Sequence, residues 1–440
     1  MKADLRVMQI PLKGIEREIR SLLSHPGHPI SEVVDLLLTK SVQFNSSDIH
    51  FEPTSYGLRV RYRIDGMFHD IMCVPKAVQE QVISRIKVMA DLHPHKREIV
   101  QEGRIPFEWN DKALDFRISI VPTVAGEKMV VRIFDPLRST FELEELGYSP
   151  GILEKMTSML MGLQGMVILT GPAGSGKTTT LYSCLLKVRE ELGHFASIVA
   201  IEDPVEYEVG EFAQMQVNRT HGLDFANGLK AVLRQDPEVI MVGEIRDEET
   251  CEVALKAALT GHLVLTTIHA GNTAEVVVRM LNMEMRPFIV ASAVTGVVAQ
   301  RLVRVICPDC RMPWKLEDAY EELIKESLGL EEVYTYRGRG CETCQGTGYR
   351  GRTVIGELMT IDEDMRREIL SGTSTSELAA LARQKGMRTV FEDGLQRVID
   401  GITTFEEVLR VAGASHVKKT ARDGDESVTS FDEVLRLANV

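Results

Sequence analysis

The segment of the chain that is most informative for chemistry is rich in glycine and ends in lysine and threonine. It lies between an apolar strand-like run and a helix-like run, and it reads Gly171-Pro172-Ala173-Gly174-Ser175-Gly176-Lys177-Thr178, followed by Thr179. Glycines let backbone N–H groups turn towards a phosphate, and the start of a helix adds its positive dipole. Lys177 can then reach the β- and γ-phosphate oxygens, and the Thr178 hydroxyl can bind Mg²⁺. The segment predicts a site for ATP and Mg²⁺.

Acidic residues follow the next apolar run. The strand-like segment Ile198 to Ile201 leads into Glu202 and Asp203, and Glu206 comes shortly afterwards. Carboxylates at the end of a strand beside a phosphate loop can bind the metal ion or its water shell. We therefore expect Glu202 to be a catalytic residue, and Asp203 and Glu206 to help bind the nucleotide and its metal.

Two further apolar runs end in side chains that suit hydrolysis. The run from Val239 to Val242 is followed by Glu244, which we predict to be the base that orients or deprotonates the attacking water. The run from Leu263 to Ile268 is followed by His269, and α/β proteins bind their ligands at this carboxyl edge of the sheet. We expect His269 to sense the γ-phosphate. The alternatives are a solvated surface carboxylate for Glu244 and a structural histidine for His269.

Four of the seven cysteines form two Cys-x-x-Cys pairs, Cys307 with Cys310 and Cys341 with Cys344. Two such pairs suit tetrahedral binding of Zn²⁺ by four thiolates, so we expect a closed structural zinc site. The other three cysteines are scattered along the chain, and we expect buried thiols at Cys73, Cys184 and Cys251.

The residues before the phosphate loop alternate in a way that predicts a small α+β domain. Helical patterns are expected to residue 25, from Ser31 to about Phe44 and from about Lys76 to Asp91. Leu58, Val60, Tyr62 and Ile64 alternate with charged residues, which predicts a half-buried strand with a cationic outer face. Further strands are expected around residues 115–121 and 128–134.

The region that contains the phosphate loop reads as an α/β nucleotide-binding fold. Its short apolar runs alternate with helical stretches, which predicts a parallel sheet buried on both faces. Ser149 and Pro150 suit the cap and first position of the opening helix. The expected domain boundaries are 1–26 for an N-terminal helix and linker, 27–135 for the α+β domain, 136–148 for a linker, 149–305 for the ATPase core, 306–352 for the tetracysteine subdomain, 353–413 for a helical region, and 414–440 for a flexible tail with a terminal helix.

Composition excludes some classes of protein. The chain has 440 residues, with 51 Lys and Arg against 64 Asp and Glu, and its net charge of −13 disfavours nucleic acid as a partner. Charges interrupt every apolar run near the N-terminus, so neither a signal peptide nor a membrane span is predicted. We expect a cytoplasmic protein. A nucleotide-dependent scaffold without turnover and a nucleic-acid translocase remain the alternative functions.

Taken together, these motifs resemble those of the secretion ATPases that drive type II secretion and type IV pilus assembly. The resemblance covers about residues 30 to 413. Besides the phosphate loop, it rests on Ser47-Asp48-Ile49-His50 with Glu52, Arg61-Tyr62-Arg63-Ile64-Asp65-Gly66, Arg234-Gln235-Asp236-Pro237, Gly243-Glu244-Ile245-Arg246-Asp247 and Leu259-Thr260-Gly261-His262. Family members that dock on the membrane machinery usually carry a further N-terminal domain, whereas about 25 residues precede the matching region here.

The resemblance implies a RecA-like motor domain preceded by a small PAS-like domain, and a homo-hexameric ring. It also implies a membrane platform protein as partner, at the inner face of the cytoplasmic membrane, and pilin or pseudopilin subunits as the cargo. The tetracysteine insertion marks the secretion and pilus-extension members. Four arginines on strands of the first domain become candidates to neutralise phosphate charge from the same or a neighbouring subunit: Arg61, Arg63, Arg117 and Arg132.

The C-terminal part of the chain nearly repeats itself. Residues 403–410 read TTFEEVLR, and residues 429–436 read TSFDEVLR, with a polar segment between them. Two similar amphipathic helices with no shared role are one interpretation, and a docking helix is the other.

Overall fold

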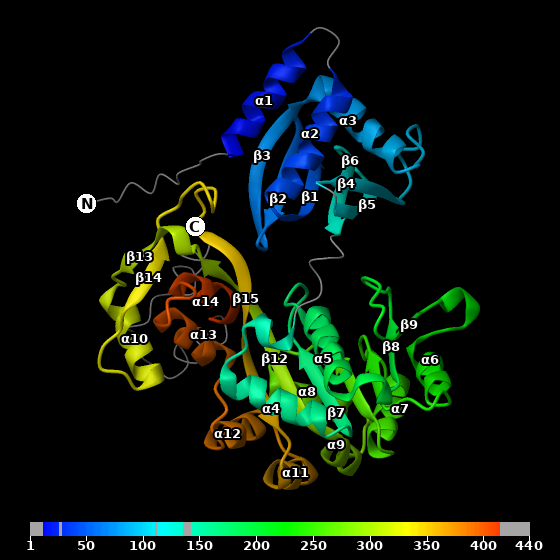
Figure 1. Cartoon of the computed structure of the whole chain (residues 1–440), viewed down its shortest axis with the longest axis vertical. Helices are drawn as coiled ribbons and strands as arrows, with labels where there is room; N and C mark the ends of the chain where they lie inside the picture. The colour runs from blue at the N-terminus through cyan, green and yellow to red at the C-terminus, as the bar shows by residue number, and fades with distance from the viewer. Residues whose placement is uncertain (1–11, 26–28, 111, 135–141, 414–440) are drawn as a thin grey trace. The chain divides into compact units, whose positions relative to one another are not determined.

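The computed structural model describes residues 12–25, 29–110, 112–134 and 142–413, and these residues divide between two compact units (Figure 1). Unit 1 comprises residues 1–138 together with Cys307–Arg311 and Gly338–Gly351, and unit 2 comprises the rest of the chain. The tetracysteine segments therefore cluster with the N-terminal residues, although they follow the ATPase core in sequence.

Unit 1 is a six-stranded sheet with helices packed on it, in the strand order β3-β2-β1-β6-β5-β4. All its adjacent pairs are antiparallel. Its elements are α1 (Leu12–Ser24), α2 (Ile30–Gln43), β1 (Ser46–Pro53), β2 (Gly57–Ile64), β3 (Met67–Pro75), α3 (Lys76–Met89), β4 (Gln101–Trp109), β5 (Lys112–Thr123) and β6 (Gly126–Phe134). The predicted α+β arrangement is observed, and the part of the first helix before residue 12 lies outside the described residues.

The alternation in β2 produces the two faces of this sheet. Val60 and Tyr62 are fully buried, and the Tyr62 hydroxyl donates a hydrogen bond to the Leu37 carbonyl oxygen of α2 at 2.6 Å. Arg61 and Arg63 point to the other face, because successive side chains of a strand alternate. The helices therefore cover the apolar face, and the arginines line the polar one.

Strand β4 was not predicted from the sequence. Its residues include Glu102, Arg104 and Glu108 as well as Pro106, a composition that argues against a strand in the middle of a sheet. The structure places β4 at the edge of the sheet, paired with β5 alone. An edge strand tolerates both proline and charge, which explains why pattern reasoning missed it.

Unit 2 is built on a seven-stranded sheet in the order β15-β12-β7-β11-β10-β8-β9 (Figure 1). The pairs from β12 to β9 are parallel. The sheet elements are β7 (Gly165–Thr170), β8 (Ile198–Glu202), β9 (Ala213–Gln216), β10 (Val239–Val242), β11 (Leu263–Thr267), β12 (Val294–Ile306) and β15 (Tyr349–Thr360). All residues of β7, β10 and β11 are buried, so the predicted parallel sheet covered on both faces is observed.

Helices connect and cover these strands. They are α4 (Pro150–Met161), α5 (Lys177–Leu192), α6 (Phe225–Val232), α7 (Glu248–Leu259), α8 (Thr273–Asn282) and α9 (Pro287–Ala293). Pro150 does open α4 after Ser149, as predicted, although the Ser149 side chain makes no capping hydrogen bond to the helix backbone. The helices α5, α7 and α9 all contact the central strand β7.

Three strands of this sheet, β9, β12 and β15, were not predicted, and one expected helical boundary moves. β12 contains Gln300, Arg301 and Arg304 within an apolar run, so it did not read as a strand. The helical region expected from residue 353 begins only at Glu363, because residues up to Thr360 belong to β15. A strand buried on both faces has no period-two pattern, so its apolar residues cannot be told from those of a helix.

The C-terminal helices begin at well-formed caps. They are α11 (Glu363–Leu370), α12 (Thr375–Gln384), α13 (Val390–Ile399) and α14 (Phe405–Ala412). The side chains of Asp362, Ser374, Thr389 and Thr404 accept a hydrogen bond from the third backbone N–H of the helix that each precedes. The chain also forms β13 (Arg311–Trp314), α10 (Asp318–Leu328) and β14 (Thr335–Gly338). Among the described helices, none has both the length and the apolar character needed to cross a membrane.

Candidate functional site

The phosphate loop joins the end of β7 to the start of α5. Gly171, Gly174 and Gly176 have φ angles of +150°, +75° and +86°, values that a residue with a side chain rarely adopts. A Cβ atom on Gly171 would lie 2.6 Å from the Gln300 carbonyl oxygen and 2.7 Å from the Ser175 hydroxyl. The glycines are therefore required by the shape of the loop.

Lys177 folds back over this loop. Its Nζ atom donates hydrogen bonds to the carbonyl oxygens of Gly171 at 2.9 Å and Pro172 at 3.0 Å. Burial, together with the nearby charge of Arg301, lowers the pKa of Lys177, while Glu244 acts in the opposite direction. The lysine thus sits in the cradle of the loop with backbone oxygens as its hydrogen-bond partners. These are contacts that a phosphate group can replace.

The rest of the loop divides into exposed and buried positions. Pro172, Ala173 and Gly174 are exposed, whereas Ser175 is 3% exposed and its hydroxyl has no hydrogen-bond partner among the described residues. Thr178 and Thr179 lie half-buried in the first turn of α5. Ser175, Thr178 and Thr179 thus all lie at the N-terminus of α5, and anions bind at helix N-termini.

Strand β12 contributes side chains that sequence reasoning did not identify. The Gln300 side chain donates a hydrogen bond to the Ser175 carbonyl oxygen at 2.7 Å and accepts one from the Tyr148 hydroxyl at 2.6 Å. Arg301 donates to the Gln300 carbonyl oxygen and to the Gly271 carbonyl oxygen, both at 2.9 Å. No strand was predicted at residues 294–306, so nothing in the sequence indicated that Gln300 and Arg301 lie against the phosphate loop.

Glu244 lies beyond β10 and His269 beyond β11, on neighbouring parallel strands. One Glu244 carboxylate oxygen lies 3.6 Å from Nε2 of His269, and the other forms an ion pair with Arg246 at 2.5 Å. The Glu244 side chain is 15% exposed and that of His269 is 51% exposed. A hydrogen bond from Thr267 to the Gly243 carbonyl oxygen, at 2.9 Å, links the two strand ends. The two predicted catalytic groups are therefore brought together at the edge of the sheet.

Glu202 is buried, with 3% of its surface exposed. The Tyr182 hydroxyl of α5 donates a short hydrogen bond to one carboxylate oxygen, and the Gln214 side chain donates to the other at 3.0 Å. Burial raises the pKa of Glu202, and these two hydrogen bonds offset part of that effect. Both oxygens are thus already bound by protein groups.

The other two predicted carboxylates follow Glu202 in the chain. Asp203 is exposed and forms an ion pair with Arg219 at 2.8 Å, and Glu206 is half-buried in the following loop. Both lie beyond the end of β8, at the same edge of the sheet as Glu244. The structure therefore keeps them at this edge, with a protein partner for Asp203.

The four predicted arginines lie on the polar face of unit 1. Asp48 pairs in register with Arg63 on β2 and with Arg132 on β6, and Arg132 pairs in turn with Arg117 on β5. Asp48 lies 3.8 Å from Arg63 and 3.2 Å from Arg132. The register therefore places three arginines and one aspartate in a row across four strands, a cationic stripe.

The remaining contacts of these arginines also lie within unit 1. Arg61 donates a hydrogen bond to Glu52 at 2.7 Å. The guanidinium carbons of Arg61 and Arg63 lie 4.1 Å and 3.9 Å from the centre of the Phe68 ring. Arg117 lies 3.9 Å from Asp115, on its own strand. Each of the four arginines is thus held by a carboxylate or an aromatic ring, which orients its guanidinium group.

The four cysteines of the two pairs converge on one another, as predicted, and the segments that carry them belong to unit 1. Their Sγ atoms all lie within 4.8 Å of one another, with 3.8 Å from Cys307 to Cys341, 3.8 Å from Cys310 to Cys344, and 3.6 Å from Cys341 to Cys344. Four thiolates at roughly 2.3 Å from one zinc ion would be roughly 3.8 Å apart, so the donor set fits tetrahedral zinc.

The surroundings of the four sulfur atoms also suit thiolates. The backbone N–H groups of Cys341 and Gly348 donate to the Cys344 sulfur at 3.1 Å and 3.3 Å. Of the three cysteines outside the quartet, Cys184 and Cys251 are buried as expected, and burial raises the pKa of each thiol to about 12. The expectation for Cys73 was wrong, because the outer face of β3 leaves it exposed.

Comparison with known proteins identifies the family of the chain. A family described as type II/IV secretion system protein matches residues 25–410. The chain belongs to the type II/IV secretion system protein family. It is 41% identical over 395 residues to the type II secretion system protein HxcR of Pseudomonas aeruginosa, covering 90% of this chain and 80% of the relative. The resemblance predicted from the motifs is confirmed.

Other members of the type II/IV secretion system family are named as ATPases. The type IV pilus assembly ATPase PilB of Thermus thermophilus is 40% identical over 398 residues, which is 90% of this chain and 44% of that longer protein. The type II secretion system ATPase E of Vibrio cholerae is 37% identical over 398 residues, covering 90% of this chain and 77% of the relative. The chain is an ATPase of this family.

Solved structures share the fold at low sequence identity. The Legionella pneumophila ATPase DotB superposes with a TM-score of 0.65 at 21% identity, covering 89% of this chain and 99% of that one. The pilus retraction motor PilT with bound ADP gives 0.54 at 21% identity, covering 88% and 99%. The predicted α/β ATPase fold is confirmed.

Proposed function

We propose that the chain acts as a homo-hexameric motor that couples ATP hydrolysis to the assembly of pilin or pseudopilin subunits. The observation that carries the proposal is the juxtaposition of the phosphate loop, Glu244 and His269 at one edge of the parallel sheet. Membership of the type II/IV secretion system family supports the coupling to fibre assembly and protein export. The motor would work on a membrane platform protein, at the cytoplasmic face of the inner membrane, with no nucleic acid involved.

Each group at this edge then has a role in turnover. The loop amides and Lys177 would bind the triphosphate, and the Thr178 hydroxyl would bind Mg²⁺, which neutralises phosphate charge. Glu244 would orient and deprotonate the attacking water, and His269, 3.6 Å from it, would report the presence of the γ-phosphate. Asp203 and Glu206 would bind water molecules of the metal shell, and Thr179 would complete the nucleotide site.

Two residues acquire roles from the geometry around the loop. Arg301 adds a second positive charge beside Lys177, and its partners in the structure are backbone oxygens, so we propose that it contacts a phosphate oxygen. Glu202 already has Tyr182 and Gln214 on its two oxygens. Its proposed part in catalysis therefore requires it to act through these groups or to exchange one of them for a metal-bound water.

The four arginines on the polar face of the unit 1 sheet would face phosphate in the assembled ring. Arg61, Arg63, Arg117 and Arg132 would then neutralise charge that develops on the γ-phosphate, in the same subunit or in a neighbour. The cysteine quartet would bind one structural zinc ion per chain, with its four thiolates as the ligands.

A turnover assay with two matched variants tests the motor proposal. Glu244→Gln keeps the shape of the side chain but removes the base, so ATP binding should persist while turnover falls on the order of 10²- to 10⁴-fold. Glu248→Gln makes the same chemical change at an exposed position in the first turn of α7 and should leave turnover unchanged. Phosphate release and nucleotide binding should be measured on the same purified oligomer.

The outcome also separates the motor from a scaffold that merely clamps nucleotide. Wild-type protein that binds ATP but releases no phosphate would establish the clamp. Turnover by Glu244→Gln at the wild-type rate would remove Glu244 as the base. Turnover stimulated by DNA, with a steep loss at higher salt, would instead support a translocase.

A further inference from the structure

The repeat near the C-terminus extends further than its central motif. Residues 402–412 read ITTFEEVLRVA, and residues 428–438 read VTSFDEVLRLA. Each difference between the two copies exchanges one residue for another of the same chemical type: Ile for Val, Thr for Ser, Glu for Asp, and Val for Leu. The first copy contains α14 and lies in unit 2, whereas the second lies outside the described residues.

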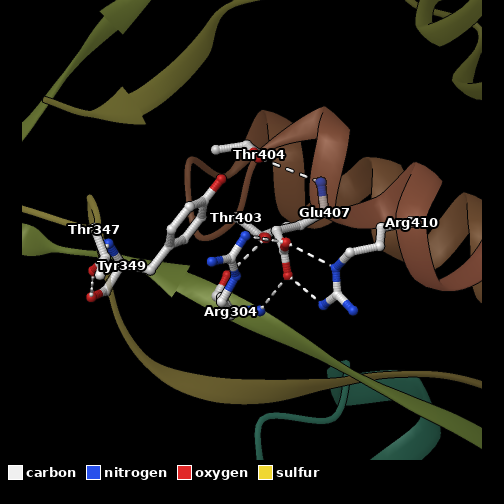
Figure 2. Close-up of polar contacts among 7 residues, drawn as sticks. All are labelled: Arg304, Thr347, Tyr349, Thr403, Thr404, Glu407 and Arg410. Atoms are coloured by element: carbon white, nitrogen blue, oxygen red, sulfur yellow. Dashed lines mark hydrogen bonds and ion pairs between the residues drawn. The ribbon is translucent and has the colours of Figure 1, made fainter. Parts of the chain in front are cut away.

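The polar residues of the first copy are bound in a specific way. Glu407 is 2% exposed and lies between two arginines, as Figure 2 shows. Arg304 of β12 approaches it at 2.5 Å, and Arg410 donates two hydrogen bonds at 2.7 Å and 3.0 Å. The Thr403 hydroxyl, just before the helix, donates to the Arg304 carbonyl oxygen at 2.7 Å, and the Thr404 side chain caps the helix.

The apolar residues of the first copy fill a defined socket. Phe405, Val408 and Leu409 are buried, and the Phe405 ring lies 5.0 Å from that of Tyr320. A Cβ atom on Gly394 of α13 would lie 2.7 Å from Val408, so this valine packs directly on the helix backbone. We call the surface that holds α14 the α14 socket; its main residues are Arg304, Leu316, Tyr320, Ile324, Phe391, Gly394, Leu395 and Val398.

The second copy keeps every residue type that the socket contacts. Thr429, Phe431, Glu433, Val434 and Arg436 are identical to their counterparts in the first copy, and Ser430, another preferred capping residue, replaces the capping threonine. The central change between the copies, glutamate to aspartate, falls at residue 406, which is exposed. The residues that form the buried ion pair and the aromatic contact are thus identical in the two copies.

An unrelated amphipathic helix would not need this match. Amphipathicity requires apolar residues at helical spacing and leaves the polar positions free. Here the repeated polar residues are the threonine before the helix and the glutamate and arginine of a buried ion pair. Burying these groups without partners is strongly destabilising. Their repetition therefore indicates that the second copy binds where the same partners are present.

We infer that the α14 socket is a binding site for two ligands of the same chain, α14 itself and the C-terminal segment 428–438. The two segments bind in exchange, because one socket holds one helix. The segment 428–438 would place Glu433 against Arg304 when α14 leaves.

The length of the intervening chain sets how often the exchange occurs. When segment 428–438 is bound, the 26 residues from 402 to 427 form a closed loop. The probability of closing a loop falls with roughly the three-halves power of its length, so the exchanged state is disfavoured by roughly a hundredfold. Since the two copies match in sequence and would make equivalent contacts, about one molecule in a hundred should have segment 428–438 in its socket.

Hydrogen exchange on the full-length chain tests this inference. In the wild-type chain the α14 amides should have a protection factor limited to about 100, below that of α13 amides, because α14 is released in the exchanged state. Glu433→Gln should raise the protection of α14 at least tenfold, since segment 428–438 then no longer competes. Asp432→Asn removes one negative charge at the neighbouring position and should change nothing.

The reverse perturbation gives the second readout. In Glu407→Gln the amides of residues 431–436 should become protected, and adding Glu433→Gln should abolish that protection. Equal α14 protection in the wild-type and Glu433→Gln chains would overturn the inference, even if Glu407→Gln does not fold. The double variant should also be mixed with wild-type chain. If the wild-type chain restores protection of α14 in the double variant, the segment binds between two chains, and binding within one chain would be overturned.

Discussion

The buried ion pair at Glu407 should control how firmly α14 is held, with a magnitude that follows from its pKa. Burial alone would raise the pKa of Glu407, but the hydrogen bonds from Arg410 and Arg304 lower it from an ordinary value of 4.5 to about 2. Opening of α14 returns the carboxylate to water and restores its ordinary pKa. A difference of about 2.5 units corresponds to about 3 kcal/mol, or a factor of about 300 in the opening equilibrium at pH 7.

The perturbation is Glu407→Gln, which removes the charge and keeps the shape of the side chain. Both the variant and its reference should also carry Glu433→Gln, so that segment 428–438 cannot replace α14. Hydrogen exchange of the α14 amides then reports the opening equilibrium directly, and we expect the protection factor to fall about 300-fold at pH 7.

The dependence on pH provides the stricter check. A folded-state pKa below the unfolded value gives stability that is complete above the unfolded pKa and lost as the pH falls through the folded pKa. The difference between variant and reference should therefore narrow to about 80-fold at pH 4 and about tenfold at pH 3. A difference below tenfold at pH 7, or one that widens on acidification, would refute the assignment of this ion pair.

Three further predictions concern the nucleotide and metal sites. Arg301→Gln should weaken ATP binding in calorimetry by about 10- to 150-fold, because it removes one charge-assisted hydrogen bond worth about 1.5–3 kcal/mol. Arg301→Lys should have an intermediate affinity. A change below threefold would contradict a phosphate contact. Tyr182→Phe removes a hydrogen bond that lowers the pKa of Glu202, so the acid limb of the ATPase pH profile should move to higher pH, and an unmoved limb would show that Glu202 ionisation is irrelevant to turnover. Metal analysis of the wild-type protein should find about one zinc ion per chain. Cys310→Ser should lose most of this zinc and Cys184→Ser should lose none, so equal zinc content in the two variants would contradict the site.

The sequence predicted those parts of the fold in which local pattern and tertiary role agree. The runs 165–170, 198–201 and 239–242 are apolar, short and bounded by turn residues, and each is a buried strand in the structure. The phosphate loop, Glu244 and His269 could be placed because each follows such a strand, and parallel strands end at one edge.

The parts that were missed depend on contacts that no local pattern encodes. β12 carries Gln300 and Arg301 because the phosphate loop provides partners for them, and without that knowledge the two residues look like an interruption. β4 carries Pro106 because it lies at an edge. Glu202 was predicted from its position at a strand end, yet its hydrogen bonds to Tyr182 and Gln214 depend on how α5 and the loop after β8 pack.

Strand β12 connects two sites within unit 2, the phosphate loop and the ion pair that holds α14. Arg301, beside the phosphate loop, and Arg304, which contacts Glu407, are separated by two residues of one extended and largely buried segment. Because a close-packed interior transmits strain, a shift of β12 at one of these arginines would also act on the other. Any such coupling has to be reciprocal, so occupancy of the loop and retention of the last described helix would change each other by the same factor.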